Sequence, residues 1–73
     1  MRGNYIYGRL GKCVSAARKK RGLTQEDLSG ITCLHRTHIA RLERGELNPS
    51  FWTLLSLSRK LKISLSYLLR GIK

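Results

Sequence analysis

Apolar residues recur at every third or fourth position along most of the chain, the spacing that places them on one face of an α-helix. No run alternates apolar and polar residues with the period of two that a half-buried strand shows. The apolar stripes consist of Ile6, Leu10, Val14 and Ala17, then Phe51, Leu54, Leu57 and Leu61, and finally Leu65 and Leu68. This pattern predicts an all-α fold.

Capping residues mark the ends of the first two predicted helices. Gly22 follows a basic last turn, as expected at a helix C-terminus. Thr24 is a favourable N-cap, and Asp27, three positions later, completes a variant of the capping box. Gly30 weakens the interior of this second helix, and we therefore expect it to be short.

The remaining helices are bounded in the same way. A third helix is expected over about residues 35–44 and ends at Gly45, while Ser50 and Ser64 are the expected N-caps of a fourth and a fifth. Five short helices with brief connections leave no visible linker, repeat or low-complexity segment. Residues 1–73 are therefore interpreted as one domain.

The chain is strongly basic. Fifteen Lys and Arg residues stand against four Asp and Glu residues, which gives a formal net charge of +11. Such an excess destabilises a small folded state by self-repulsion, and nucleic acid is the usual partner of a basic small domain. An anionic membrane surface is the other candidate, but a basic membrane-surface peptide does not explain several capped helices.

Several other classes of function are disfavoured. A chain of 73 residues has little room for a substrate cleft, and we do not expect an enzyme. Zinc binding by Cys13, Cys33, His35 and His38 is an alternative, but the cysteines form no CxxC pair. Neither a signal peptide nor an apolar run of about 20 residues is evident. We expect a cytoplasmic protein with no membrane contact, metal, cofactor or small-molecule ligand.

Residues 25–45 have the properties that reading a DNA groove requires. A short helix leads through a tight connection into a second helix, of which one side is cationic and hydrogen-bonding and the other is apolar. The polar side carries Arg36, Thr37, His38 and Arg41, and the apolar side carries Ile39 and Leu42.

The chain resembles the Cro/C1-type (Xre-like) helix-turn-helix domain of phage repressors and small bacterial regulators in four segments: LTQEDL, RTHIARLERG, NPSFWTLL and LKISLSYLL. The resemblance covers about residues 9–70 and is strongest to the controller proteins of restriction–modification systems. It implies a compact five-helix, lambda-repressor-like domain. Its helix-turn-helix would lie at about 24–45 and a dimerisation helix at about 64–70.

The resemblance implies that the second helix lies across the DNA backbone and that the third enters the major groove. Arg36 would bind O6 and N7 of a guanine, Thr37 would meet a thymine methyl or a phosphate, and His38 and Arg41 would contact a base or the backbone. The alternatives are solvated charge for the arginines, support of the helix start for Thr37 and a surface histidine for His38. The expected phosphate contacts come from Thr24, Gln25, His35, Arg44, Asn48, Ser50 and Trp52. For His35 the alternative is a helix cap, and for Trp52 a partly buried aromatic.

Other residues have structural roles by resemblance. Arg18 and Glu43 would form a partly buried ion pair between the first helix and the end of the third, unless they are two independent surface charges. Cys33 stands where the family often has glycine, and a positive φ there would strain it. Helix-turn-helix proteins pair two copies about one DNA turn, ~34 Å, apart. The candidates for this two-fold contact are Leu55, Leu65, Tyr67 and Leu68, with capping of the monomer core as the alternative.

The sequence therefore predicts a transcription regulator that binds double-stranded DNA sequence-specifically, as a homodimer on a (pseudo)palindromic operator. Its resemblance to controllers implies that it regulates its own promoter. An antitoxin or a phage-type repressor of the same fold is one alternative. A non-specific nucleic-acid binder driven by charge alone is the other, and it would show steep salt dependence with little sequence preference.

Overall fold

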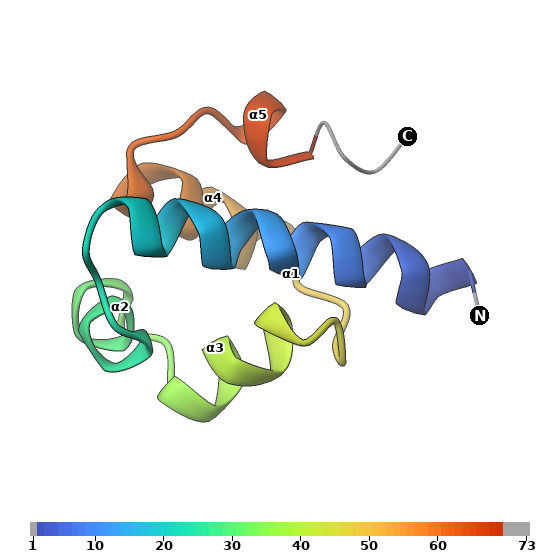
Figure 1. Ribbon diagram of the computed structural model, residues 1–73, viewed down its shortest axis with the longest axis horizontal. Helices are drawn as coiled ribbons and strands as arrows, with labels where there is room; N and C mark the ends of the chain where they lie inside the picture. The colour runs from blue at the N-terminus through green and yellow to red at the C-terminus, as the bar shows by residue number, and fades with distance from the viewer. Residues whose placement is uncertain (1, 70–73) are drawn as a thin grey trace.

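The computed structural model describes the backbone of residues 2–69 and the side chains of residues 6–69 (Figure 1). Within this range the helices are α1 (Arg2–Lys20), α2 (Gln25–Thr32), α3 (Arg36–Glu43), α4 (Phe51–Leu61) and α5 (Leu65–Leu69). Residues 2–69 contain no strand, and the predicted all-α fold is confirmed. Residue 70, the last position of the predicted dimerisation helix, lies outside the described residues.

The helices are arranged around α1, which runs along the length of the molecule (Figure 1). In this view α2 and α3 lie on one side of α1, α5 lies on the other side, and α4 lies behind α1. α3 packs against both α1 and α2, whereas α5 packs against α1 and α4. α1 therefore separates the face that carries α3 from the face that carries α5. Among residues 2–69, no helix combines the length and the apolar character needed to cross a membrane.

Side-chain caps begin α2, α4 and α5, as predicted. The Thr24 hydroxyl accepts a 2.9 Å hydrogen bond from the Asp27 N–H, and the Asp27 carboxylate accepts one of 2.9 Å from the Thr24 N–H. The hydroxyls of Ser50 and Ser64 each accept from the N–H of the third residue of the following helix, at 3.1 and 2.9 Å. These bonds satisfy N–H groups that have no partner within the helix.

The core is one cluster of aliphatic side chains to which all five helices contribute. Its buried members are Leu10, Val14, Ala17, Leu28, Ile39, Leu42, Leu57, Leu61 and Leu68. Burial of these side chains supplies the main driving force for folding, because apolar surface is removed from water. Leu10, Val14 and Ala17 of the predicted α1 stripe, and Leu54, Leu57 and Leu61 of the α4 stripe, belong to this cluster or pack against it.

Two predicted placements are corrected by the structure. Phe51 is 67% exposed although its spacing placed it on the core face. It is the first residue of α4, and helix side chains tilt toward the N-terminus, so its ring extends past the end of the helix. Leu68 was predicted in the dimer contact, but it is 0% exposed. Because α5 has only five residues, it uses this leucine to pack on the core, and no surface of the side chain is left for a second copy.

α1 and the end of α3 approach each other closely at two glycines. A Cβ at Gly11 would lie 2.5 Å from the carbonyl oxygen of Leu42 and closer still to that of Glu43. A Cβ at Gly45, where φ is +74°, would lie 2.7 Å from the Cα of Gly8. The absence of side chains at residues 11 and 45 therefore lets α3 end directly against α1, which fixes the position of α3.

Candidate nucleic-acid interface

The three-residue turn between α2 and α3 is held by side-chain hydrogen bonds. Cys33 adopts the left-handed conformation (φ 63°, ψ 18°), and its N–H donates to the Ser29 carbonyl. The Ser29 hydroxyl donates to the Leu34 carbonyl at 2.5 Å, and the Thr32 hydroxyl accepts from the Leu34 N–H at 3.3 Å. Cys33 thus has the positive φ that a glycine adopts more easily, at a cost of about 1 kcal/mol or more for a residue with a Cβ. The bonds around it fix the angle between the two helices.

α3 presents a row of polar side chains to solvent. His35 is its N-cap: Nδ1 accepts a 3.1 Å hydrogen bond from the Thr37 N–H, so the capping role left open for His35 is observed. Arg36, Thr37 and Arg41 are all exposed, while Ile39 and Leu42 of the helix are buried. The exposed groups are hydrogen-bond donors and cations, which suit the acceptor-rich edge of guanine and the phosphates.

His38 differs from its neighbours on α3. It is half-buried, and its Nε2 atom is enclosed and has no hydrogen-bond partner among the described residues. In this structure Nε2 lies inward, beside the row formed by Arg36, Thr37 and Arg41. The base-reading role of His38 stays a prediction, and it requires the other ring nitrogen or a different ring orientation.

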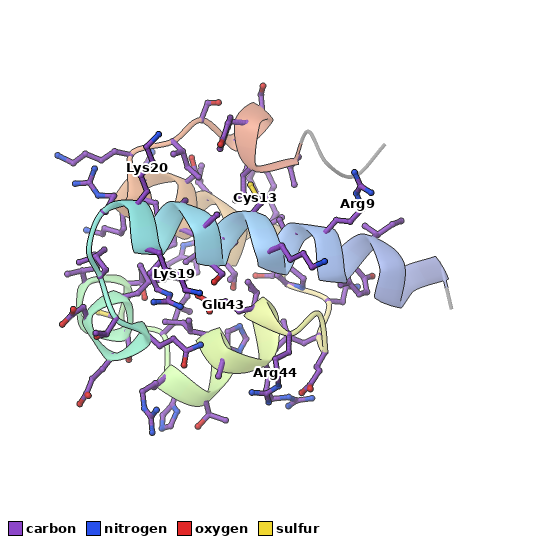
Figure 2. The ribbon with its side chains drawn as sticks, in the orientation of Figure 1. Arg9, Cys13, Lys19, Lys20, Glu43 and Arg44 are labelled. Atoms are coloured by element: carbon purple, nitrogen blue, oxygen red, sulfur yellow. The ribbon has the colours of Figure 1, made fainter. Side chains whose placement is uncertain are left out.

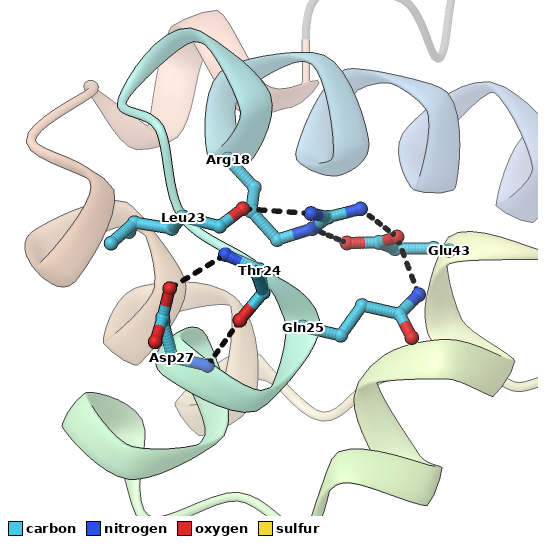
Figure 3. A network of polar contacts seen from close by, with 6 residues as sticks. All are labelled: Arg18, Leu23, Thr24, Gln25, Asp27 and Glu43. Atoms are coloured by element: carbon cyan, nitrogen blue, oxygen red, sulfur yellow. Dashed lines mark hydrogen bonds and ion pairs between the residues drawn. The ribbon is translucent and has the colours of Figure 1, made fainter.

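A buried polar network holds the C-terminal end of α3 (Figure 3). Arg18 Nε lies 2.7 Å from Glu43 Oε2, Arg18 Nη2 lies 3.0 Å from Oε1, and the two side chains are 9% and 7% exposed. Arg18 Nη1 also donates to the Leu23 carbonyl at 2.8 Å. The hydrogen bond to Glu43 raises the pKa of Arg18 above its usual value. The ion pair expected from the resemblance is present and joins α1 to α3.

Gln25 completes this network from α2. Its Nε2 donates to Glu43 Oε1 at 2.9 Å, so the Glu43 carboxylate is bound by side chains of two other helices (Figure 3). Gln25 therefore braces α3 through Glu43, while its expected phosphate contact stays a prediction. Glu43 accepts both partners as a carboxylate, which makes the network charge-assisted and keeps α3 in one orientation relative to α1 and α2.

Lys19 is a candidate contact that the sequence interpretation did not include. It lines a hollow of about 440 Å³ together with Gln25, Thr24 and Arg36, at the point where α2 begins beside α3. Figure 2 shows Lys19 on the α3 side of α1 and Lys20 on the α5 side. The N-terminus of α2 and two nearby cations make this hollow favourable for a phosphate. The basic last turn of α1 was the available signal, but it was interpreted only as a helix end.

The cations at the end of α3 are partly neutralised by Glu46. Arg44 Nε lies 2.8 Å from Glu46 Oε2, and Arg41 Nε lies 3.9 Å from Oε1. The hydrogen bond from Arg44 lowers the pKa of Glu46, and that to Glu46 raises the pKa of Arg44. All three side chains are about half exposed, and solvent weakens such pairs strongly. A phosphate can therefore replace Glu46 as the partner of Arg44 at little cost.

The N-terminus of α4 carries a second group of predicted contacts. Asn48 and Ser50 are exposed, with Ser50 as the N-cap. Trp52 is 62% exposed, and Phe51 beside it is also exposed. The exposure of Phe51 was not predicted, because helical spacing alone does not distinguish the first residue of a helix from the residues inside it.

The candidates for a two-fold contact do not all face one way. Leu55 and Leu65 are half-buried, and Tyr67 is 42% exposed. Residues two apart on a helix point to different sides, so Leu65 and Tyr67 do not share a face. Tyr67 lines a cleft against the end of α1. Its backbone carbonyl lies 3.9 Å from the sulfur of Cys13, further back along α1.

The cysteine and histidine side chains do not form a cluster. Cys13 is a half-buried free thiol on α1 and Cys33 an exposed free thiol in the turn. Among the described residues, no three His, Cys, Asp or Glu side chains gather as a metal site would require.

A family model described as helix-turn-helix (HTH_3) matches residues 14–68. The chain belongs to the helix-turn-helix family. This is a family of DNA-binding transcription regulators and not of enzymes. The matched segment contains α2, the turn, α3 and all the residues of the polar network behind them.

Individual relatives show which members of the family the chain is similar to. The control protein C.SmaI of Serratia marcescens is 39% identical over 66 residues, which is 88% of this chain and 79% of that protein. The immunity repressor of Bacillus phage phi105 is 39% identical over 57 residues, 78% of this chain but only 40% of the repressor. The crystal structure of the restriction–modification controller protein C.AhdI from Aeromonas hydrophila superposes with a TM-score of 0.82 at 31% identity, covering 85% of this chain and 94% of the controller. The chain is thus similar in sequence, fold and size to controller proteins.

Proposed function

We propose that this chain is a sequence-specific transcription regulator whose α3 reads base edges in the major groove of double-stranded DNA. The observation that carries the proposal is the exposed row Arg36, Thr37 and Arg41 on a helix that hydrogen bonds and an ion pair hold in place on its opposite side. Groove reading requires both parts: side chains that bind base edges and a scaffold that sets their register. The Arg18–Glu43 pair and the Gln25 bond supply the second part.

Each exposed residue of the row has a role that its chemistry suits. Arg36, in the first turn of α3, donates two parallel hydrogen bonds to O6 and N7 of a guanine. Thr37 places its methyl group against a thymine or its hydroxyl on a phosphate. Arg41, one turn further along, binds a base or the backbone. A good bidentate contact contributes roughly 1–3 kcal/mol of discrimination against the wrong base.

Phosphate contacts flank this row at two helix N-termini. At α2, Thr24, Gln25 and Lys19 surround the hollow beside Arg36, where backbone N–H groups and a cation attract a phosphate. At α4, the exposed side chains are Asn48, Ser50 and Trp52. Arg44 joins them by exchanging Glu46 for a phosphate, and His35 lies at the start of α3 near the same backbone. Such contacts set register and affinity without selecting a sequence.

The protein acts as a homodimer in this proposal. One recognition helix covers too few base pairs to select a site in a genome, and two copies about one DNA turn apart double the contact. Leu65 on α5 and Leu55 on α4 are the candidates for the two-fold contact, because both keep apolar surface that their own core does not cover. A two-fold axis requires a (pseudo)palindromic operator.

The biological role that the similarity favours is that of a restriction–modification controller acting on its own promoter. Its support is the likeness to C.SmaI and C.AhdI along most of their lengths. A phage-type repressor is the second candidate, supported by the immunity repressor of phage phi105, of which this chain covers 40%.

The proposal is tested by selecting binding sites from random duplexes and then measuring competition at one fixed salt concentration. We expect enrichment of an inverted repeat, and a labelled duplex carrying the repeat should resist a large excess of random DNA. Enrichment of no motif, with equal competition by any duplex, would leave only charge-driven binding. A duplex from upstream of the chain's own gene distinguishes the controller from a repressor of other promoters.

A further inference from the structure

A cleft lies on the face of the molecule away from α3. Its volume is about 770 Å³, and it is bounded by the C-terminal end of α1, the end of α4 and the start of α5. Its apolar lining comes from Ala17, Leu61 and Ile63, and Ser64 and Tyr67 line it as well. The size is within the range of ligand-binding clefts in proteins.

The rim of this cleft is cationic. Lys20 and Arg21 come from the end of α1, and Lys62 comes from the C-cap of α4. All three are exposed, and none has an ion-pair partner among the described residues. Three cations held around an apolar base repel one another, and they are stabilised by an occupant that is both anionic and apolar.

The cleft is separate from the surface that the recognition helix presents to DNA. Lys20 points to the α5 side of α1, whereas Lys19 points to the α3 side (Figure 2). α5, which forms part of the cleft, packs on α1 and α4. A duplex lying along α3 therefore leaves the cleft open.

A second copy of the chain does not match the cleft in charge. The chain has only four acidic residues, Glu26, Asp27, Glu43 and Glu46. Glu43 is bound to Arg18, Glu46 to Arg44, and Asp27 to the α2 N-terminus. Glu26 is exposed and forms no ion pair among the described residues, but a single carboxylate cannot balance the three cations of the cleft on a partner copy.

We propose that this cleft binds an acidic segment of another protein, one that inserts an aliphatic or aromatic side chain between Lys20, Arg21 and Lys62. The apolar base distinguishes this occupant from nucleic acid. A duplex is too wide to enter, and a single strand would gain from stacking on several aromatic rings, whereas Tyr67 is the only ring in the cleft. A regulator that holds DNA with α3 would thereby present a docking site to a second protein on its opposite side.

The test uses the full chain and a fluorescein-labelled synthetic peptide of alternating acidic residues, leucine and phenylalanine. Anisotropy gives Kd, and amide chemical shifts of the ¹⁵N-labelled chain locate the site. We expect saturable binding with the largest shifts at Ala17, Ile63 and Tyr67. The double variant Lys20→Gln with Arg21→Gln should raise Kd about fivefold or more. The single variants Lys20→Gln and Lys12→Gln then compare equal losses of charge on α1: Lys12→Gln, outside the cleft, should change Kd by less than about twofold and by less than Lys20→Gln does.

Three further probes decide the occupant. A peptide with asparagine and glutamine for the acids, and one with serine for leucine and phenylalanine, should each bind at least about fivefold more weakly. Equal binding of the serine peptide would overturn the proposal, because charge alone would then explain it. Shifts centred on α3, or tighter binding of oligothymidylate in the cleft, would overturn it too. So would a peptide that dissociates a dimer while binding, since a second copy would then occupy the cleft.

Discussion

Arg18 Nε and Glu43 Oε2 lie 2.7 Å apart and join α1 to α3 across 25 residues of sequence. Both side chains are more than nine-tenths buried. A buried pair contributes little net stability, but removing one partner leaves the other charge stranded. The pair therefore sets the orientation of α3 more than it adds to the free energy of unfolding.

Glu43→Gln should lower the free energy of unfolding by about 3 kcal/mol, because Arg18 keeps its charge and loses its carboxylate. Urea unfolding followed by circular dichroism measures this. The double variant Arg18→Met with Glu43→Leu should recover most of the loss, since no buried charge remains. A single variant as stable as the parent would show that the pair is solvated.

Gly11→Ala should destabilise the chain by about 1–3 kcal/mol, because the new methyl group meets the carbonyl groups of Leu42 and Glu43. Gly8→Ala is the matched control on the same helix, where a Cβ would have nothing within 4 Å. It should be neutral or stabilise by up to about 1 kcal/mol. Thermal unfolding of both variants checks these two predictions. If Gly8→Ala were less stable than Gly11→Ala, α3 would not end against α1.

Asp27 should make α2 sensitive to acid. Its hydrogen bond with the Thr24 N–H lowers its pKa in the folded state. A lowered folded-state pKa gives stability that is present above the unfolded-state pKa and is lost as the pH falls toward the folded-state value. Asp27→Asn should lose stability at neutral pH and show a flatter profile at acidic pH. Unfolding midpoints measured from neutral to strongly acidic pH would show parallel curves if the capping box contributed nothing.

The sequence predicted correctly those features that depend on residues close together along the chain. Thr24, Ser50 and Ser64 predicted the starts of three helices because a cap acts on the N–H groups of its own first turn. Ile39 and Leu42 were correctly assigned to the core from helical spacing. The positive φ at Cys33 came instead from the resemblance, because the family often has glycine at this place, and a differently shaped turn was the alternative.

Placements that depend on neighbouring helices were not available from the sequence. Leu68 is buried because α5 lies across α1 and α4, and spacing within five residues cannot distinguish this from an outward contact. His38 has the same sequence signal as Thr37, and only the packing of α3 turns its ring inward. Lys19 and Lys20 are neighbours in the sequence, and they lie on different faces of the molecule only because α1 runs between those faces.

Leu65→Glu should give a monomer with poor affinity for the operator, because it places a charge on the proposed two-fold contact. Sedimentation velocity measures the association state, and circular dichroism checks that α5 folding is kept. Ser66→Glu adds the same charge at a neighbouring exposed position and should remain dimeric. If the Leu65 variant were a stable dimer, the contact would lie elsewhere on the chain.

The central claim is that Arg36 selects the bases. The most direct measurement compares the Kd of Arg36→Ala for the selected operator and for a random duplex of equal length at one salt concentration. We expect operator affinity to fall by roughly 1–3 kcal/mol while random-duplex affinity changes little. Lys20→Ala removes the same charge from the opposite face and should preserve the preference. An equal loss on both duplexes would show that Arg36 contributes charge only, and α3 would not be the reading helix.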